Sequence, residues 1–118
     1  MTIEDVRAIL GAKIVVGEEW KDKEVHTACG SDMMSDVLAF MKDQSILLTG
    51  LCNMQVIRTC EMMDIICVAF VRGKTPDDAM IEMAKEKEIA ILTTGHRMFS
   101  ACGMLYEKGL RGGPGYRE

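Results

Sequence analysis

The segment Gly73-Lys74-Thr75 is the part of this chain that comes closest to a phosphate-binding loop. It follows an apolar run and precedes a helical pattern that begins at Pro76. A complete loop needs another glycine at its far end, where N–H groups surround the phosphates, and Val68 stands there. We therefore expect no nucleotide hydrolysis. Arg72, Lys74 and Thr75 beside a helix start still form a candidate anion site, the alternative being a tight turn with solvated side chains.

A second polar turn, Thr93-Thr94-Gly95-His96, follows another apolar run. His96 could transfer a proton or contact an anion there, although such a histidine more often caps or packs at a helix start. His26 is the other histidine, and neither has a partner at a zinc-ligand spacing. No Ser, His and acid arrangement and no Gly-x-Ser-x-Gly elbow can be drawn. We therefore expect that the protein is not an enzyme.

The chain contains five cysteines, most of them within apolar runs, and this pattern does not indicate a disulfide framework. Iron–sulfur proteins usually hold their cluster with closely spaced cysteine pairs, which this sequence lacks. Cys60 and Cys67 fit core positions, where a thiol behaves as a small apolar group. The candidates for a redox or metal role are Cys29, Cys52 and Cys102. We expect no metal and no cofactor.

Charge and hydrophobicity limit the classes of partner. The chain has 118 residues, a net charge of −4 and a pI near 5.2. Nucleic-acid binding depends on Lys and Arg that neutralise phosphates, so nucleic acid is not an expected partner. No apolar run approaches the ~20 residues that cross a membrane, and Glu4 and Asp5 stand where a secretory signal has basic residues. We predict a cytoplasmic protein with no membrane partner.

The polar turns are positioned by an alternation of short apolar runs and amphipathic segments. Runs of strand length lie at 12–16, 25–29, 46–49, 65–71 and 89–93. Helical patterns lie at 3–10, 33–41, 53–63, 76–87 and 97–106. This alternation predicts an α/β fold, with a single domain, a mostly parallel β-sheet and helices on both faces. We place the domain at residues 1–108 and expect a flexible, Gly-rich C-terminal tail at 109–118.

Right-handed crossovers bring the carboxyl ends of parallel strands to one edge of the sheet, where open α/β sheets bind ligands. Gly30, Gly50, Gly73 and Gly95 each follow a predicted strand, so we expect them to converge at this edge. The candidate ligand-binding residues are Gly50, Arg72, Gly73, Lys74, Thr75, Thr93, Thr94 and His96.

Methionine is frequent in this chain, with 11 residues, and most of them fall on the predicted helices. Core packing accounts for the larger part of this flexible apolar surface. The rest suits an apolar interface, and two-fold dimers are the commonest way to bury one. We therefore expect a homodimer.

Three segments follow one another in an order typical of a known family: 45–50, 66–76 and 84–94, the last leading to Phe99. With them, residues from about Val25 to Tyr106 resemble the DRTGG domain, a regulatory module of some phosphotransacetylases and CBS-domain pyrophosphatases that is related to the N-terminal domain of HPr kinase. Gly50-Leu51-Cys52 stands where the family has Gly-Asp-Arg, and Val71-Arg72-Gly73 stands where it has Thr-Gly-Gly. Gly50 and Gly73 are therefore the matching motif residues.

The resemblance implies a non-catalytic α/β module that dimerises and regulates or scaffolds something else. We expect a protein partner in a regulated enzyme system, and a small anionic metabolite or nucleotide as a candidate ligand. One alternative is a small enzyme that acts on a phosphorylated or acyl substrate at the same edge through His96. The other is a redox or metal-cluster accessory protein that uses Cys29, Cys52 or Cys102.

Overall fold

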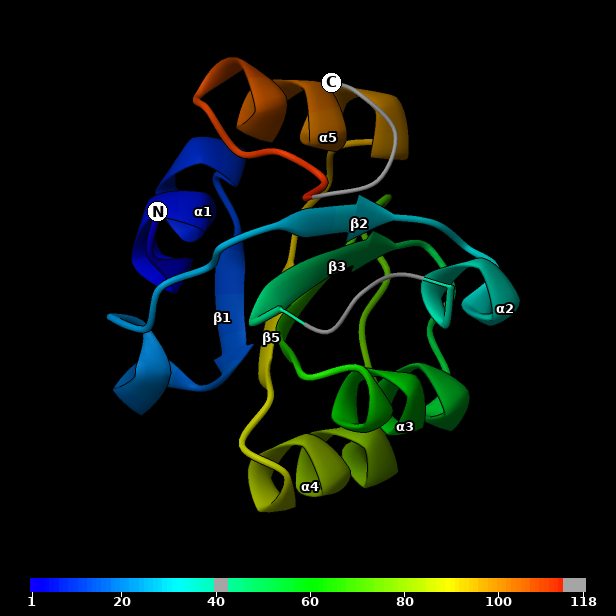
Figure 1. Cartoon of the computed structure of the whole chain (residues 1–118). Helices are drawn as coiled ribbons and strands as arrows, with labels where there is room; N and C mark the ends of the chain where they lie inside the picture. Colours follow the sequence, from blue (N-terminus) through cyan, green and yellow to red (C-terminus); the bar gives the residue numbers. More distant parts are fainter. Residues whose placement is uncertain (40–42, 114–118) are drawn as a thin grey trace.

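A five-stranded sheet forms the centre of the computed structural model, which describes residues 1–39 and 43–113 (Figure 1). The strands are β1 (Lys13–Val16), β2 (Ala28–Gly30), β3 (Ser45–Thr49), β4 (Ile65–Phe70) and β5 (Ala90–Thr93). They lie in the order β1-β5-β4-β3-β2. The strands from β2 to β5 pair in parallel, and β1 pairs antiparallel with β5. The predicted α/β class with a mostly parallel sheet is confirmed.

The central strands are covered on both faces, which explains why their sequences are continuously apolar. Every residue of β3 is buried. Because side chains alternate along a strand, Leu47 belongs to the core on one face, and Ile46 and Leu48 belong to the core on the other. The sheet therefore separates two apolar layers.

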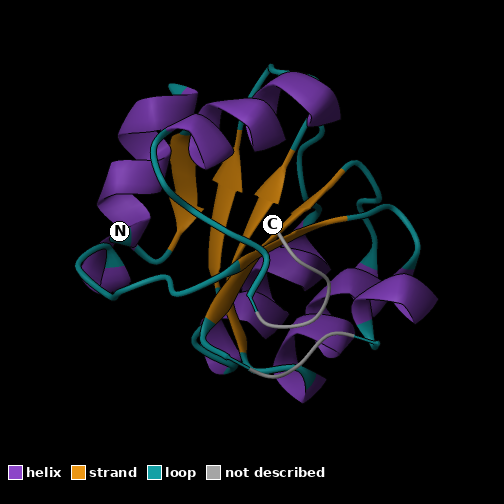
Figure 2. Cartoon of the chain, turned by 45° about the horizontal axis from the view of Figure 1, so that its top comes forward, coloured by secondary structure: helices purple, strands orange, loops and turns teal. Residues whose placement is uncertain are grey.

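Helices lie on both faces of the sheet (Figure 2). One face packs against α2 (Met34–Val37), α3 (Met54–Met62) and α4 (Asp78–Glu86). The other packs against α1 (Ile3–Leu10) and α5 (Met98–Glu107). A short 3-10 helix, η1 (Glu18–Trp20), follows β1. Each helix from α2 to α4 connects two neighbouring parallel strands, and successive right-handed crossovers place such helices on the same face.

The helix expected over residues 33–41 is shorter in the structure. It spans Met34–Val37 as α2, and its buried side chains are Met34 and Val37. The end of the predicted range, residues 40 and 41, lies outside the described residues. No helix in the described ranges is both long and apolar enough to cross a membrane.

The first described residues of the tail, 109–113, follow α5 and lie beside β2, the outermost strand on that side. Leu110 is buried, and the Arg111 carbonyl accepts a hydrogen bond of 2.9 Å from the Ala28 N–H. Residues 114–118 lie outside the described residues. The domain limit at 108 and the flexibility of the tail stay predictions.

Candidate ligand-binding site

The turns that follow β3, β4 and β5 lie together at the carboxyl edge of the sheet. The N–H groups of Arg72 and Gly73 donate to the carbonyls of His96 and Thr94, at 2.8 and 2.9 Å. Next to them, the Val71 N–H donates to the last carbonyl of β3 at 3.0 Å. These bonds bring the predicted site residues of three separate segments onto one rim.

The side chain of Arg72 crosses the turn that follows β3. Arg72 has a left-handed backbone conformation, with φ at 59°. A Cβ atom placed on Gly50 would overlap the Arg72 guanidinium, whose Cζ lies 2.7 Å from that position. The Arg72 side chain therefore lies directly over Gly50, and a larger residue at position 50 would displace the guanidinium from this place.

Asp32 is a residue at this edge that the sequence analysis did not include among the site residues. Its Oδ1 accepts hydrogen bonds from the Gly50 N–H at 2.6 Å and from the Thr49 hydroxyl at 3.2 Å. Its Oδ2 lies 3.7 Å from Nη2 of Arg72. A backbone N–H, a hydroxyl and a guanidinium thus converge on one carboxylate, as they would on a bound anion. The available signal was that Asp32 stands two residues after Gly30, with which β2 ends.

Thr94 is buried and its hydroxyl is already used. It donates to the Leu10 carbonyl at the end of α1, at 3.1 Å, and it accepts from the His96 N–H at 3.3 Å. Thr93 is half-buried at the end of β5, opposite Lys13 of β1. The structure therefore gives Thr94 a positioning role and uses the one hydrogen that its hydroxyl can donate.

Lys74, Thr75 and His96 are exposed on the same rim. Within the described part of the chain, their side chains make no hydrogen bond or ion pair. They are free to contact a ligand, and Lys74 carries a positive charge for an anion.

The helix start expected beside Lys74 and Thr75 is displaced in the structure. α4 begins at Asp78, because the Asp77 carboxylate accepts a 2.9 Å hydrogen bond from the Met80 N–H and caps the helix. The expectation of free helical N–H groups beginning at Pro76 was wrong. An acidic side chain of the same helix start therefore already accepts from one of its first N–H groups.

The five cysteines are free, and burial raises the pKa of each thiol. The pKa of Cys29 rises to about 11 and that of Cys60 to about 12. A raised pKa leaves little thiolate, which is the nucleophilic and metal-binding form. Among residues 1–39 and 43–113, no group of three or more His, Cys, Asp and Glu residues is placed to hold a metal ion.

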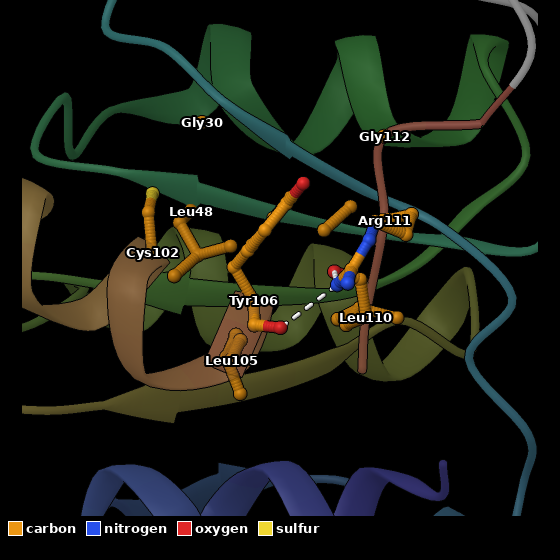
Figure 3. Close-up of a pocket in the computed structure, with 9 residues that line it drawn as sticks. Gly30, Leu48, Cys102, Leu105, Tyr106, Leu110, Arg111 and Gly112 are labelled. Atoms are coloured by element: carbon orange, nitrogen blue, oxygen red, sulfur yellow. Dashed lines mark hydrogen bonds between the residues drawn. The ribbon is translucent and has the colours of Figure 1, made fainter. Parts of the chain in front are cut away.

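A cavity of about 150 Å³ lies near the other end of the Gly30–Asp32 segment, between α5, β2, β3 and the described part of the tail (Figure 3). Its wall includes Gly30, Leu48, Cys102 and Leu105, and Arg111 lies over the Tyr106 ring at 3.8 Å from the ring centroid. The wall is mostly apolar, which suits a small apolar group better than a phosphate. The sequence does not predict this cavity, because its walls come from segments that only the fold brings together.

The family model of the DRTGG domain matches residues 5–107 of the chain. No curated protein matches the chain. A similar solved structure contains the CBS and DRTGG domains of the regulatory region of Clostridium perfringens pyrophosphatase, complexed with the activator diadenosine tetraphosphate. The TM-score is 0.70 and the sequence identity is 20%. The similarity covers 88% of this chain and 45% of the pyrophosphatase chain, so this chain spans less than half of that relative.

Proposed function

The chain belongs to the DRTGG domain family, and we propose that it is a non-catalytic regulatory module that binds a small anionic metabolite or nucleotide at the carboxyl edge of its sheet. The family match begins at residue 5, so it reaches further toward the N-terminus than the resemblance from Val25 to Tyr106.

The set of donors at this edge carries the proposal. The Gly50 N–H donates to one oxygen of the Asp32 carboxylate at 2.6 Å, and the Arg72 guanidinium lies 3.7 Å from the other oxygen. Lys74, Thr75 and His96 extend the same rim with exposed side chains. Hydrogen bonds from charged donors and from backbone N–H groups to anionic oxygens are among the stronger polar interactions in proteins.

The related pyrophosphatase supports an anionic ligand. Its regulatory region, which contains CBS and DRTGG domains, was solved with diadenosine tetraphosphate as activator. That ligand carries a chain of phosphates, and phosphate oxygens suit the donors beside Gly50. Nucleotides are therefore the first class of compound to test with this chain.

We also propose that the module works as a cytoplasmic homodimer and passes its ligand state to a protein partner in a regulated enzyme system. Two large side chains on α5 support an apolar interface. Phe99 is 84% exposed and Tyr106 is 46% exposed, and they lie about two helical turns apart on one face. A second copy that covers this face would remove both side chains from water.

Thermal unfolding in the presence of nucleotides and acyl phosphates tests the ligand and its site. A ligand at about 100 times its Kd should stabilise the wild-type protein by about 2.7 kcal/mol. Arg72→Ala and Lys74→Ala should each reduce that stabilisation, because each removes a positive charge from the rim. Lys85→Ala is the control, since Lys85 is an exposed residue of α4 paired with Glu82.

Two results would contradict the proposal in different ways. If a ligand stabilises Arg72→Ala as strongly as wild type, the ligand binds elsewhere on the molecule. If no compound of either class changes the unfolding temperature of the wild-type protein, the module acts by scaffolding, without a ligand of this kind.

A further inference from the structure

The donors beside Gly50 are fixed by the fold. The Thr49 side chain is fully buried, with 0% exposure, and its oxygen accepts a 3.1 Å hydrogen bond from the Leu51 N–H. The Thr49 hydroxyl hydrogen is left to point at Asp32, to which it donates at 3.2 Å. The Gly50 N–H follows directly after β3 and donates to the same oxygen at 2.6 Å. Two donors on rigid backbone therefore aim at one oxygen position, where a buried hydroxyl needs an acceptor.

Apart from its two hydrogen bonds from Thr49 and Gly50, the occupant of this position is held by an exposed ion pair. The side chains of Asp32 and Arg72 are each 49% exposed, and their closest charged atoms are 3.7 Å apart. Exposed ion pairs of this kind contribute little to stability. The backbone around Asp32 is anchored separately, because the Ser31 N–H donates to Leu48 and the Met34 side chain is buried. The carboxylate can leave by rotation of its own side chain while the strand and the short helix α2 stay in place.

We propose that Asp32 is an internal competitor of the ligand. Its carboxylate fills the oxyanion position formed by the Gly50 N–H, the Thr49 hydroxyl and the Arg72 guanidinium, and a phosphate or carboxylate group of the ligand binds there only when Asp32 has swung away. The inference rests on the proposed function, since it concerns the regulation of the same edge. If Asp32 occupies the position about 90% of the time, the apparent affinity for an anion falls about tenfold.

Inorganic pyrophosphate is a suitable probe, because it has phosphate oxygens and no base or sugar that could bind elsewhere. The full chain labelled with ¹⁵N is titrated with pyrophosphate, and the amide signals of Gly50 and Arg72 are followed by NMR. Asp32→Ala empties the position and should tighten pyrophosphate binding at least tenfold over wild type, with the Gly50 signal moving on titration. Asp32→Asn keeps an acceptor for the Gly50 N–H without the charge, so its affinity should lie between the two.

Asp36→Ala is the matched control for net charge. Asp36 is an exposed acid of α2 that lies close in sequence to Asp32, and its side chain makes no hydrogen bond or ion pair with the described residues. Its removal changes the charge of the protein by the same amount and should leave pyrophosphate affinity within about twofold of wild type. Arg72→Ala in the Asp32→Ala background should abolish the gain, because the guanidinium is the charged donor of the position.

Equal pyrophosphate affinities of the wild-type, Asp32→Asn and Asp32→Ala proteins would overturn the inference, as would an Asp36→Ala protein that gains as much as Asp32→Ala. Failure of all of these proteins to bind pyrophosphate would overturn it as well. A different result would contradict the proposed function alone. In that result Asp32→Ala binds pyrophosphate tightly, but no nucleotide or acyl phosphate stabilises the wild-type protein. If instead a screened ligand loses its effect in Arg72→Ala and is indifferent to Asp32→Ala, the proposed function stands and the competition does not.

Discussion

Arg72 connects the turn after β4, in which it lies, with the turns after β3 and β5. Its left-handed backbone costs about 1 kcal/mol for a residue with a side chain. Among the described residues, the other non-glycine positions with positive φ are Gln44, Asp64 and Glu88, and each of them precedes a strand. Arg72 follows a strand, and its conformation accompanies a side chain that crosses Gly50 toward Asp32. Backbone strain of this kind often accompanies a functional contact.

Thr94 allows a test that separates positioning from binding. Thr94→Val removes the hydroxyl that donates to the Leu10 carbonyl and leaves that buried carbonyl without its donor. We expect the free energy of unfolding to fall by about 1–3 kcal/mol, measured by urea denaturation. Thr93→Val is the control, and it should stay within about 0.5 kcal/mol of wild type because the Thr93 hydroxyl has no partner in the described structure. An unchanged stability of Thr94→Val, with a loss of ligand binding, would instead assign Thr94 to the ligand.

At the scale of elements, α1 begins with a capping box whose stability depends on pH. The Thr2 N–H donates to the Asp5 carboxylate at 2.9 Å, and the Thr2 hydroxyl accepts from the Asp5 N–H at 3.0 Å. The backbone hydrogen bond from Thr2 is the largest factor that lowers the pKa of Asp5 below its ordinary value of 3.8. The contribution of ionised Asp5 is therefore fully present above pH 3.8 and is lost as the pH falls through the lowered pKa.

Two variants check this cap by urea denaturation at several pH values. Asp5→Asn should be less stable than wild type at neutral pH, and the difference should shrink as the pH falls below 3.8. Thr2→Ala should lower the free energy of unfolding by about 1 kcal/mol at neutral pH, because it removes the N-cap hydroxyl. A difference between Asp5→Asn and wild type that grows in acid would show that the carboxylate does not stabilise the helix.

At the scale of the whole molecule, the proposed homodimer is expected to form through the outer face of α5. Phe99 is 84% exposed there, more than any other large apolar side chain in the described ranges. If this face forms the dimer, Phe99→Glu should raise the dimer dissociation constant at least about tenfold, or about 1.4 kcal/mol, in sedimentation equilibrium. Met62→Glu is the control, because Met62 is 54% exposed on α3, which covers the opposite face of the sheet. A wild-type protein that sediments as a monomer, or a dimer that Met62→Glu disrupts equally, contradicts this assignment.

The sequence by itself determined the kind of each strand and α-helix, and the family, but not the short helix η1. Continuous apolar runs separated by amphipathic segments are local patterns, and they predicted the parallel strands and the helices that cover them on both faces. Turn glycines after the strands likewise predicted the edge at which the polar residues gather. The direction of β1, the start of α4 and the length of α2 were not available from these patterns.

Tertiary structure alone decided which polar groups meet at that edge. Asp32 reaches Gly50 across 18 residues, and Thr94 reaches Leu10 across 84, so no local spacing could pair them. Side-chain contacts between distant segments follow from how the layers pack. The Leu10 carbonyl determines the role of Thr94, and the Asp32 side chain determines the surroundings of Gly50, but neither contact changes the local sequence pattern. For this reason the sequence predicted a rim of candidate residues. Only the fold distinguished the buried Thr94 hydroxyl from the exposed Lys74 and placed the Asp32 carboxylate against the Gly50 N–H.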